Sequence, residues 1–175
     1  MAHIQYNIHA NPETIPVIHT NWYPPIAAEG KNTDYARLLM PDLASKASEM
    51  TTVHQYLFQS WMIEGSPVIR RVIERMVRVE QHHFTIIGQL IALLGGMPEC
   101  RSKEFDSYWN GNMVNYSCSM QELLSTNAES ELYAMQTYAS QAEEIKDSKI
   151  SRMLTRLSLD EKLHHQIFRD FLAQI

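Results

Sequence analysis

Two Glu-x-x-His pairs occur in the chain, Glu80 with His83 and Glu161 with His164. Residues three positions apart on an α-helix share a face, so each pair can direct a carboxylate and an imidazole at one point. One such pair would be a weak signal. Both pairs, however, lie on apolar helical stripes where aliphatic side chains are expected. Oxygen and imidazole ligands together suit iron or manganese better than a metal that prefers thiolates.

Each pair is preceded by a segment that carries a lone glutamate. Glu49 is followed seven residues later by Tyr56, and Glu131 is followed seven residues later by Tyr138. The lone glutamate lies 31 residues before the first pair and 30 residues before the second. The chain therefore repeats one helical hairpin, with Glu on one helix and Glu-x-x-His on the other. Pairing the two hairpins would bring four carboxylates and two imidazoles into one core.

Four buried carboxylates need compensating charge, because burying an unpaired acid is costly in free energy. The lysines and arginines lie off the apolar stripes, so side-chain cations are not expected to neutralise the acids. Two divalent cations would balance the four negative charges. The pattern therefore predicts a site for two metal ions, with a metal-free polar core as the alternative.

Two helical segments must position the first hairpin. We expect the first over about 33–64, with Pro41 either kinking it or marking its true start. Ser66 and Pro67 suit the N-cap and the first residue of the second helix. That helix should continue to the stop at Gly95, which is followed by another glycine.

A long loop separates the second hairpin from the first. Residues 95–118 have no helical period, and a loop of that length inside a compact domain needs a reason. A capping box from Ser119 to Glu122 opens the third helix, and Asp147 or Ser148 caps the fourth. Short, long and short connections predict an all-α four-helix bundle with one long crossover between its second and third helices.

The length and composition suit a single domain. With 175 residues and 45% hydrophobic residues, the chain can bury a sizeable core, which we place over 33–175. Residues 1–32 are predicted to form an extended N-terminal arm, because their prolines are incompatible with a continuous helix. These prolines are Pro12, Pro16, Pro24 and Pro25. The arm could wrap the body or a partner subunit, and the sequence leaves both open.

Charge and composition argue against several classes of function. A net charge of −5 without a basic patch argues against a nucleic-acid-binding protein. We find no run of about 18 apolar residues that could span a membrane, and no signal-peptide pattern at the N-terminus. Cys100 and Cys118 are too few for a disulfide framework and lack CxxC spacing. Free thiols in a reducing cytoplasm are the expectation.

These segments resemble the ferritin-like superfamily and, within it, the rubrerythrin and bacterioferritin branch. The quoted segments are SEMTTVHQYLFQ (48–59), VEQHHFTIIGQLIALLGG (79–96), AESELYAMQTY (128–138) and LDEKLHHQIF (159–168). The likeness covers about 34–175, and the order Glu, ExxH, Glu, ExxH is specific. Manganese catalases are more distant relatives with a similar ligand plan. The resemblance implies a ferritin-like bundle that forms a homo-oligomer, a dimer or larger.

Carried over by position, the resemblance implies six metal ligands: Glu49, Glu80, His83, Glu131, Glu161 and His164. Glu80 and Glu161 would bridge both metals. The lone glutamate and the histidine of each hairpin would complete one metal. Tyr56 matches a tyrosine that many relatives keep beside the metals and is the candidate catalytic residue. An ordinary interhelical tyrosine is the alternative for Tyr56.

The chain departs from the family pattern in two places. Gln81 stands where bacterioferritins carry a haem-ligating methionine, so no haem is expected. Rubrerythrins append a rubredoxin with two CxxC pairs, and this sequence contains neither pair. A peroxidase built on this chain therefore needs an external electron donor.

The residue before each Glu-x-x-His pair breaks the repeat. It is Asp160 in the second half and Val79 in the first. Metal-bound histidines usually donate their far N–H to a carboxylate or a carbonyl. In the ferritin-like arrangement this aspartate reaches the other pair's histidine, so Asp160 should hold His83, through Nδ1. His164 must then use water, a carbonyl or another side chain. A solvent-facing Asp160 is the alternative.

The resemblance implies a non-haem oxidoreductase that reduces peroxide or dioxygen at two iron or manganese ions. Two metals about 3.5–4 Å apart can clamp both oxygens of an O–O bond. Peroxidase, catalase and ferroxidase share this ligand set and differ in metal, access and electron supply. Iron storage in a large cage and a metal-free interaction bundle are the other classes that stay open.

Overall fold

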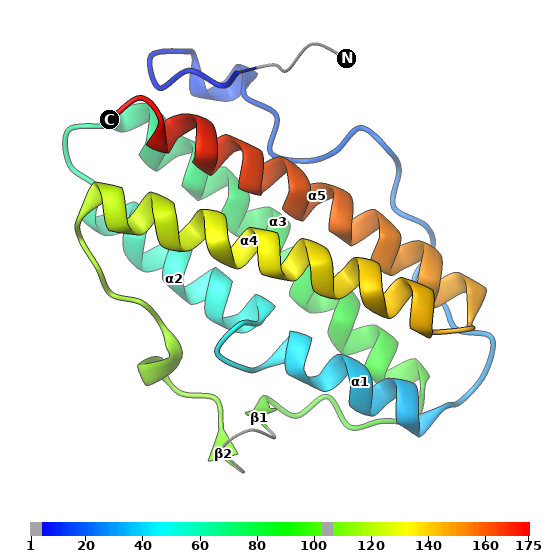
Figure 1. Cartoon of the computed structure of the whole chain (residues 1–175). Helices are drawn as coiled ribbons and strands as arrows, with labels where there is room; N and C mark the ends of the chain where they lie inside the picture. Colours follow the sequence, from blue (N-terminus) through cyan, green and yellow to red (C-terminus); the bar gives the residue numbers. More distant parts are fainter. Residues whose placement is uncertain (1–4, 103–106) are drawn as a thin grey trace.

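The computed structural model describes residues 5–102 and 107–175, which fold as an antiparallel bundle of helices (Figure 1). Its long helices are α2 (Glu49–Met62), α3 (Pro67–Leu93), α4 (Met120–Glu144) and α5 (Ser148–Leu172). The hairpin α2–α3 packs beside the hairpin α4–α5, and the long connection joins α3 to α4. The predicted four-helix bundle with one crossover is confirmed.

The first helical segment differs from the prediction, because it forms two helices. α1 (Thr33–Leu43) and α2 lie nearly end to end along one edge of the bundle (Figure 1). Pro41 lies inside α1, near its end. Ser48 caps α2 by accepting from the Thr51 N–H, and both hydroxyls donate to the Ser45 carbonyl. Such local bonds compete with helical ones, so the single continuous helix was a wrong prediction.

The other helix ends follow the signals in the sequence. Ser66 and Pro67 are the N-cap and first residue of α3, although the Ser66 side chain makes no capping hydrogen bond. After α3 the chain turns at Gly95, whose φ of 85° belongs to the left-handed region that glycine adopts freely. Ser119 caps α4, and the Asp147 carboxylate caps α5.

Two apolar clusters fill the bundle, one toward each end. Along α3, the first cluster ends at Val79 and the second begins at Ile86. Along α5, the second cluster ends at Leu157 and the first resumes at Ile167. The interval between the clusters falls at the same level on both helices. Buried polar side chains occupy this interval, which places a polar centre at mid-bundle.

The long connection between α3 and α4 packs along α2. It contains a short antiparallel pair, β1 (Arg101–Ser102) and β2 (Ser107–Tyr108), and a 3-10 turn over Gly111–Met113. The indole N–H of Trp109 donates to the Thr51 hydroxyl at 2.8 Å, near the start of α2.

The N-terminal arm lies on the body of its own chain (Figure 1). The Tyr6 N–H donates to the Asp170 carboxylate at 2.9 Å, near the end of α5. The Glu29 N–H donates to the Asp147 carboxylate at 2.6 Å, at the start of α5. The arm therefore runs the length of α5. Among the described residues, no helix is long and apolar enough to cross a membrane.

Candidate metal centre

The bundle brings all six predicted ligands to its centre. Each is at most 4% exposed: Glu49 from α2, Glu80 and His83 from α3, Glu131 from α4, and Glu161 and His164 from α5. Their polar atoms form two groups, each with atoms within 4.8 Å of one another. One group holds Glu49 and His83, the other holds Glu131 and His164, and Glu80 and Glu161 belong to both. This is the arrangement expected of two bridging and two terminal carboxylates.

Each imidazole faces the carboxylates through Nδ1. His83 Nδ1 lies 2.9 Å from Glu161 Oε1, 3.3 Å from Glu80 Oε2 and 3.9 Å from Glu49 Oε2. His164 Nδ1 lies 2.7 Å from Glu80 Oε1, 3.5 Å from Glu161 Oε2 and 3.8 Å from the lone glutamate of its own hairpin. The repeat in the sequence thus becomes an approximate twofold symmetry of the centre.

Several buried atoms at the centre lie within ion-pair distance of one another but make no hydrogen bond of good geometry with the described residues. They are Glu80 Oε1, His83 Nδ1, both carboxylate oxygens of Glu161, and His164 Nδ1. Buried polar atoms are normally paired, because an unpaired one costs free energy. Here the unpaired atoms are carboxylate oxygens and imidazole nitrogens that converge on one place. Two divalent cations would satisfy them and balance the charge, so the residues fit a di-metal carboxylate centre.

Protons balance part of the charge when no cation does. Burial, with repulsion from neighbouring carboxylates, raises the pKa of Glu49 and Glu131 well above the usual range. Burial would lower the pKa of His83 and His164, but the facing carboxylates raise it well above the usual value. For Glu161 the effects are reversed: burial would raise its pKa, but the two imidazoles lower it below the usual range. Cations that bind here must displace protons.

Two tyrosines connect the hairpins at the centre. Tyr56 on α2 donates its hydroxyl to Glu131 Oε1, and Tyr138 on α4 donates to Glu49 Oε1. Burial and the adjacent carboxylates raise the pKa of both phenols well above the usual value, so both remain donors. Tyr56 therefore lies beside the expected ligands, and its catalytic role stays a prediction. Tyr138 was not singled out, although its position seven residues after Glu131 was the available signal.

The far nitrogens of the two histidines have different partners. His83 Nε2 lies 3.1 Å from Asp160 Oδ2, and Asp160 is fully buried. The contact uses Nε2, and the predicted Nδ1 was wrong because that atom faces the carboxylates. Burial would raise the pKa of Asp160, but hydrogen bonds, first from His83, lower it to about 2. His164 Nε2 donates to the Val17 carbonyl at 2.8 Å, one of the alternatives left open.

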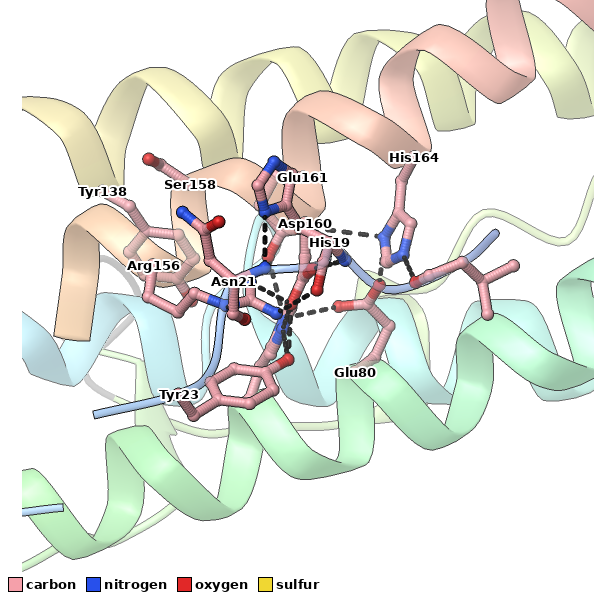
Figure 2. Close-up of polar contacts among 12 residues, drawn as sticks. His19, Asn21, Tyr23, Glu80, Tyr138, Arg156, Ser158, Asp160, Glu161 and His164 are labelled. Carbon is pink, nitrogen blue, oxygen red and sulfur yellow. Dashed lines mark hydrogen bonds and ion pairs between the residues drawn. The ribbon is translucent and has the colours of Figure 1, made fainter. Parts of the chain in front are cut away.

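Sequence reasoning missed two residues around Asp160. Arg156, one turn earlier on α5, pairs with Asp160 at 2.8 Å (Figure 2). Its i, i+4 spacing from Asp160 was the available signal. Tyr23, from the arm, donates to Asp160, and its hydroxyl lies 3.2 Å from His83 Nε2. Nothing in the sequence pattern indicated Tyr23, because periodicity does not specify the path of an extended arm.

A narrow cavity of about 40 Å³ reaches the centre between α2 and α4. Its walls include the residues at the α1–α2 break, Lys46 to Ser48, and it ends at Glu80 and Glu161. A cavity of this size holds small molecules such as water or hydrogen peroxide. Asp42 lines it and accepts from Gln141 Nε2 at 2.7 Å. Burial raises the pKa of Asp42 to about 7, although the bond from Gln141 opposes this.

Comparisons with known proteins agree with this geometry. The Rubrerythrin family model matches residues 43–172. Two solved structures of KatB, a manganese catalase from Anabaena, have a TM-score of 0.78 and 20% sequence identity. Each alignment covers 90% of this chain and 80% of the KatB chain. At this identity the likeness concerns the fold, which is that of a ferritin-like bundle. The search of curated proteins gave no match.

We predict that cation binding near neutral pH releases protons and that the apparent affinity rises with pH. The sign follows from the raised pKa of Glu49, Glu131, His83 and His164, since these groups must lose protons to become ligands. Calorimetric titration with Mn²⁺ in buffers of different ionisation enthalpy measures the protons released. Binding with no proton release between pH 6 and 8 would contradict this account.

We predict that the two metals bind with different affinity, with the tighter one on the His83 side. A charged carboxylate orients His83, whereas His164 has only a neutral carbonyl. Asp160→Asn should lower the affinity for the metal on the His83 side by about 10-fold to 100-fold. The difference in affinity between the two metals should become smaller. Lys162→Ala, on the exposed face of α5, is the matched control. Two equal binding constants in the unsubstituted chain would rule out the asymmetry.

Proposed function

The chain belongs to the rubrerythrin family, and we propose that it is a non-haem oxidoreductase that consumes hydrogen peroxide at two iron or manganese ions. The observation that carries this proposal is the convergence at mid-bundle of buried Glu80, His83, Glu161 and His164 atoms that make no hydrogen bond of good geometry. The fold it shares with KatB, a manganese catalase, supports peroxide as the substrate.

The chain contributes ligands, orientation and exclusion of bulk water. Two bound metals would supply redox change and a clamp for both oxygens of the O–O bond. Glu80 and Glu161 would hold both ions, and each histidine would hold one. Tyr56 and Tyr138 would fix the terminal carboxylates through their hydroxyl protons. The narrow cavity has room for a molecule of peroxide size, and the burial of the proposed ligands would exclude bulk water.

The reaction needs a source of electrons. Reduction of one hydrogen peroxide to two waters takes two electrons and two protons. No CxxC pair lies within these 175 residues, so the electrons come from outside them. We propose an external reductant as the donor. The manganese catalase likeness favours a second candidate, in which another peroxide molecule is the donor and is oxidised to dioxygen. Dioxygen release distinguishes the two reactions.

The cavity wall also carries a carboxyl group that can hold a proton at neutral pH. Asp42 is buried, is not one of the proposed ligands, and lines the same cavity as Glu49 and Glu80. With a pKa of about 7, its carboxyl carries a proton in part of the population at neutral pH. We propose that Asp42 supplies protons for O–O cleavage.

We predict that Glu80→Ala or Glu161→Ala empties both metal positions, whereas Glu49→Ala weakens mainly one. The reason is that the first two residues belong to both ligand groups. Elemental analysis of protein purified without chelator gives the metal content, and peroxide consumption should fall about 100-fold in either bridge variant. Glu129→Ala, exposed on α4, is the control. A Glu80→Ala variant that keeps both metals and full turnover would overturn the proposed function.

We predict that peroxide turnover falls as pH rises through about 7 and that Asp42→Asn removes this dependence. The carboxyl is protonated below its folded-state pKa and loses its proton above it, so proton supply is present at low pH and lost at high pH. Asp34→Asn, at an exposed carboxylate of the same helix, is the control. Superimposable pH profiles for the unsubstituted chain and Asp42→Asn would exclude this role.

A further inference from the structure

The N-terminal arm covers the centre on the side away from the cavity. The cavity opens between α2 and α4, whereas the arm contacts α3 and α5. Residues 15–23 form neither helix nor strand, and we call them the strap. Its side chains alternate, with Ile15 and Val17 buried against the bundle and Ile18 exposed. Pro16 disfavours a helix here, and from residue 15 to residue 19 every second side chain faces the body, as in a strand.

The strap reaches the far side of both proposed metal-binding imidazoles. At one end, the Val17 carbonyl accepts from His164 Nε2 at 2.8 Å. At the other end, the Tyr23 hydroxyl lies 3.2 Å from His83 Nε2. Between them, the His19 N–H donates to Asp160 Oδ1 at 2.6 Å. Each imidazole therefore lies between the proposed metals and the strap.

A buried arginine fastens the strap to the same aspartate. Arg156 donates to the Asn21 carbonyl at 2.6 Å and to the His19 carbonyl at 3.0 Å (Figure 2). Its guanidinium pairs with Asp160 at 2.8 Å and lies 4.0 Å from the centroid of the Tyr23 ring. The contacts that dock the strap and the contacts that orient His83 thus form one network.

We propose that the strap is a working part of the metal centre, with Tyr23 as a positioning residue, so that strap docking and metal binding strengthen each other. The proposal rests on the proposed di-metal centre. A partner on the far nitrogen fixes the ring and its tautomer, and losing such a partner typically lowers metal affinity 10-fold to 100-fold. Coupling between two binding events is reciprocal, so bound metal must hold the strap down by the same factor. The strap lies before the family match, which begins at residue 43.

The test compares Tyr23→Phe with Tyr35→Phe in the full chain. Tyr23→Phe removes one hydroxyl and keeps the ring beneath Arg156. Tyr35→Phe removes a hydroxyl that, among the described residues, accepts a hydrogen bond from the Lys146 N–H at the α4–α5 turn. We expect Mn²⁺ titration of the metal-free protein to show about a tenfold lower affinity at one of the two sites in Tyr23→Phe. The affinities of Tyr35→Phe should equal those of the unsubstituted chain.

Cleavage of the strap by thermolysin supplies a readout that does not depend on activity. Saturating Mn²⁺ should slow cleavage within residues 15–23 of the unsubstituted chain, and Tyr23→Phe should reduce this protection by the factor it loses in affinity. Mn²⁺ affinities in Tyr23→Phe that match those of the unsubstituted chain at both sites, or cleavage that Mn²⁺ does not slow, would overturn the proposed role of the strap and leave the di-metal centre standing. A chain that binds no Mn²⁺ or Fe²⁺ would overturn the centre itself.

Discussion

Four carboxylates are buried at one level of the helical bundle, and their charge limits what can surround them. Repulsion and lost hydration would drive these acids apart unless positive charge lies among them. In the described part of the chain, every ion pair of the six central residues joins a carboxylate to His83 or His164. Arg156, a buried cation nearby, pairs instead with Asp160. The centre therefore depends on protons or metal cations.

The surrounding structure can be understood as support for this centre. Apolar clusters above and below it supply the hydrophobic stabilisation that a polar middle layer cannot. Tyr56 and Tyr138 bind the lone glutamates across the hairpin interface, which keeps the approximate twofold symmetry. The symmetry ends outside the ligands, where Asp160 has no counterpart because Val79 occupies the matching position. The arm contacts both histidines, but with different groups: a backbone carbonyl accepts from His164, and a phenol hydroxyl lies beside His83.

The sequence allowed prediction of the features that depend on period and local chemistry. Helical spacing placed the six central residues on shared faces, and capping residues such as Ser119 and Asp147 marked helix ends. The break before α2 was missed because hydrogen bonds to the Ser45 carbonyl, and not Pro41, interrupt the helix. The nitrogen of His83 that contacts Asp160 was predicted wrongly because the orientation of the imidazole depends on its side-chain rotamer. The contacts of the strap with the histidines and Asp160 were not predicted, because several of them use backbone groups that every residue possesses.

Anomalous scattering shows directly whether two metals occupy the centre, when it is recorded at the iron and manganese absorption edges from crystals of protein purified without chelator. We expect two peaks about 3.5–4 Å apart, both between Glu80 and Glu161, with one beside His83 Nδ1 and the other beside His164 Nδ1. A centre without anomalous density in crystals of protein that had been supplied with both metals would contradict this expectation, as would metal bound only at the surface.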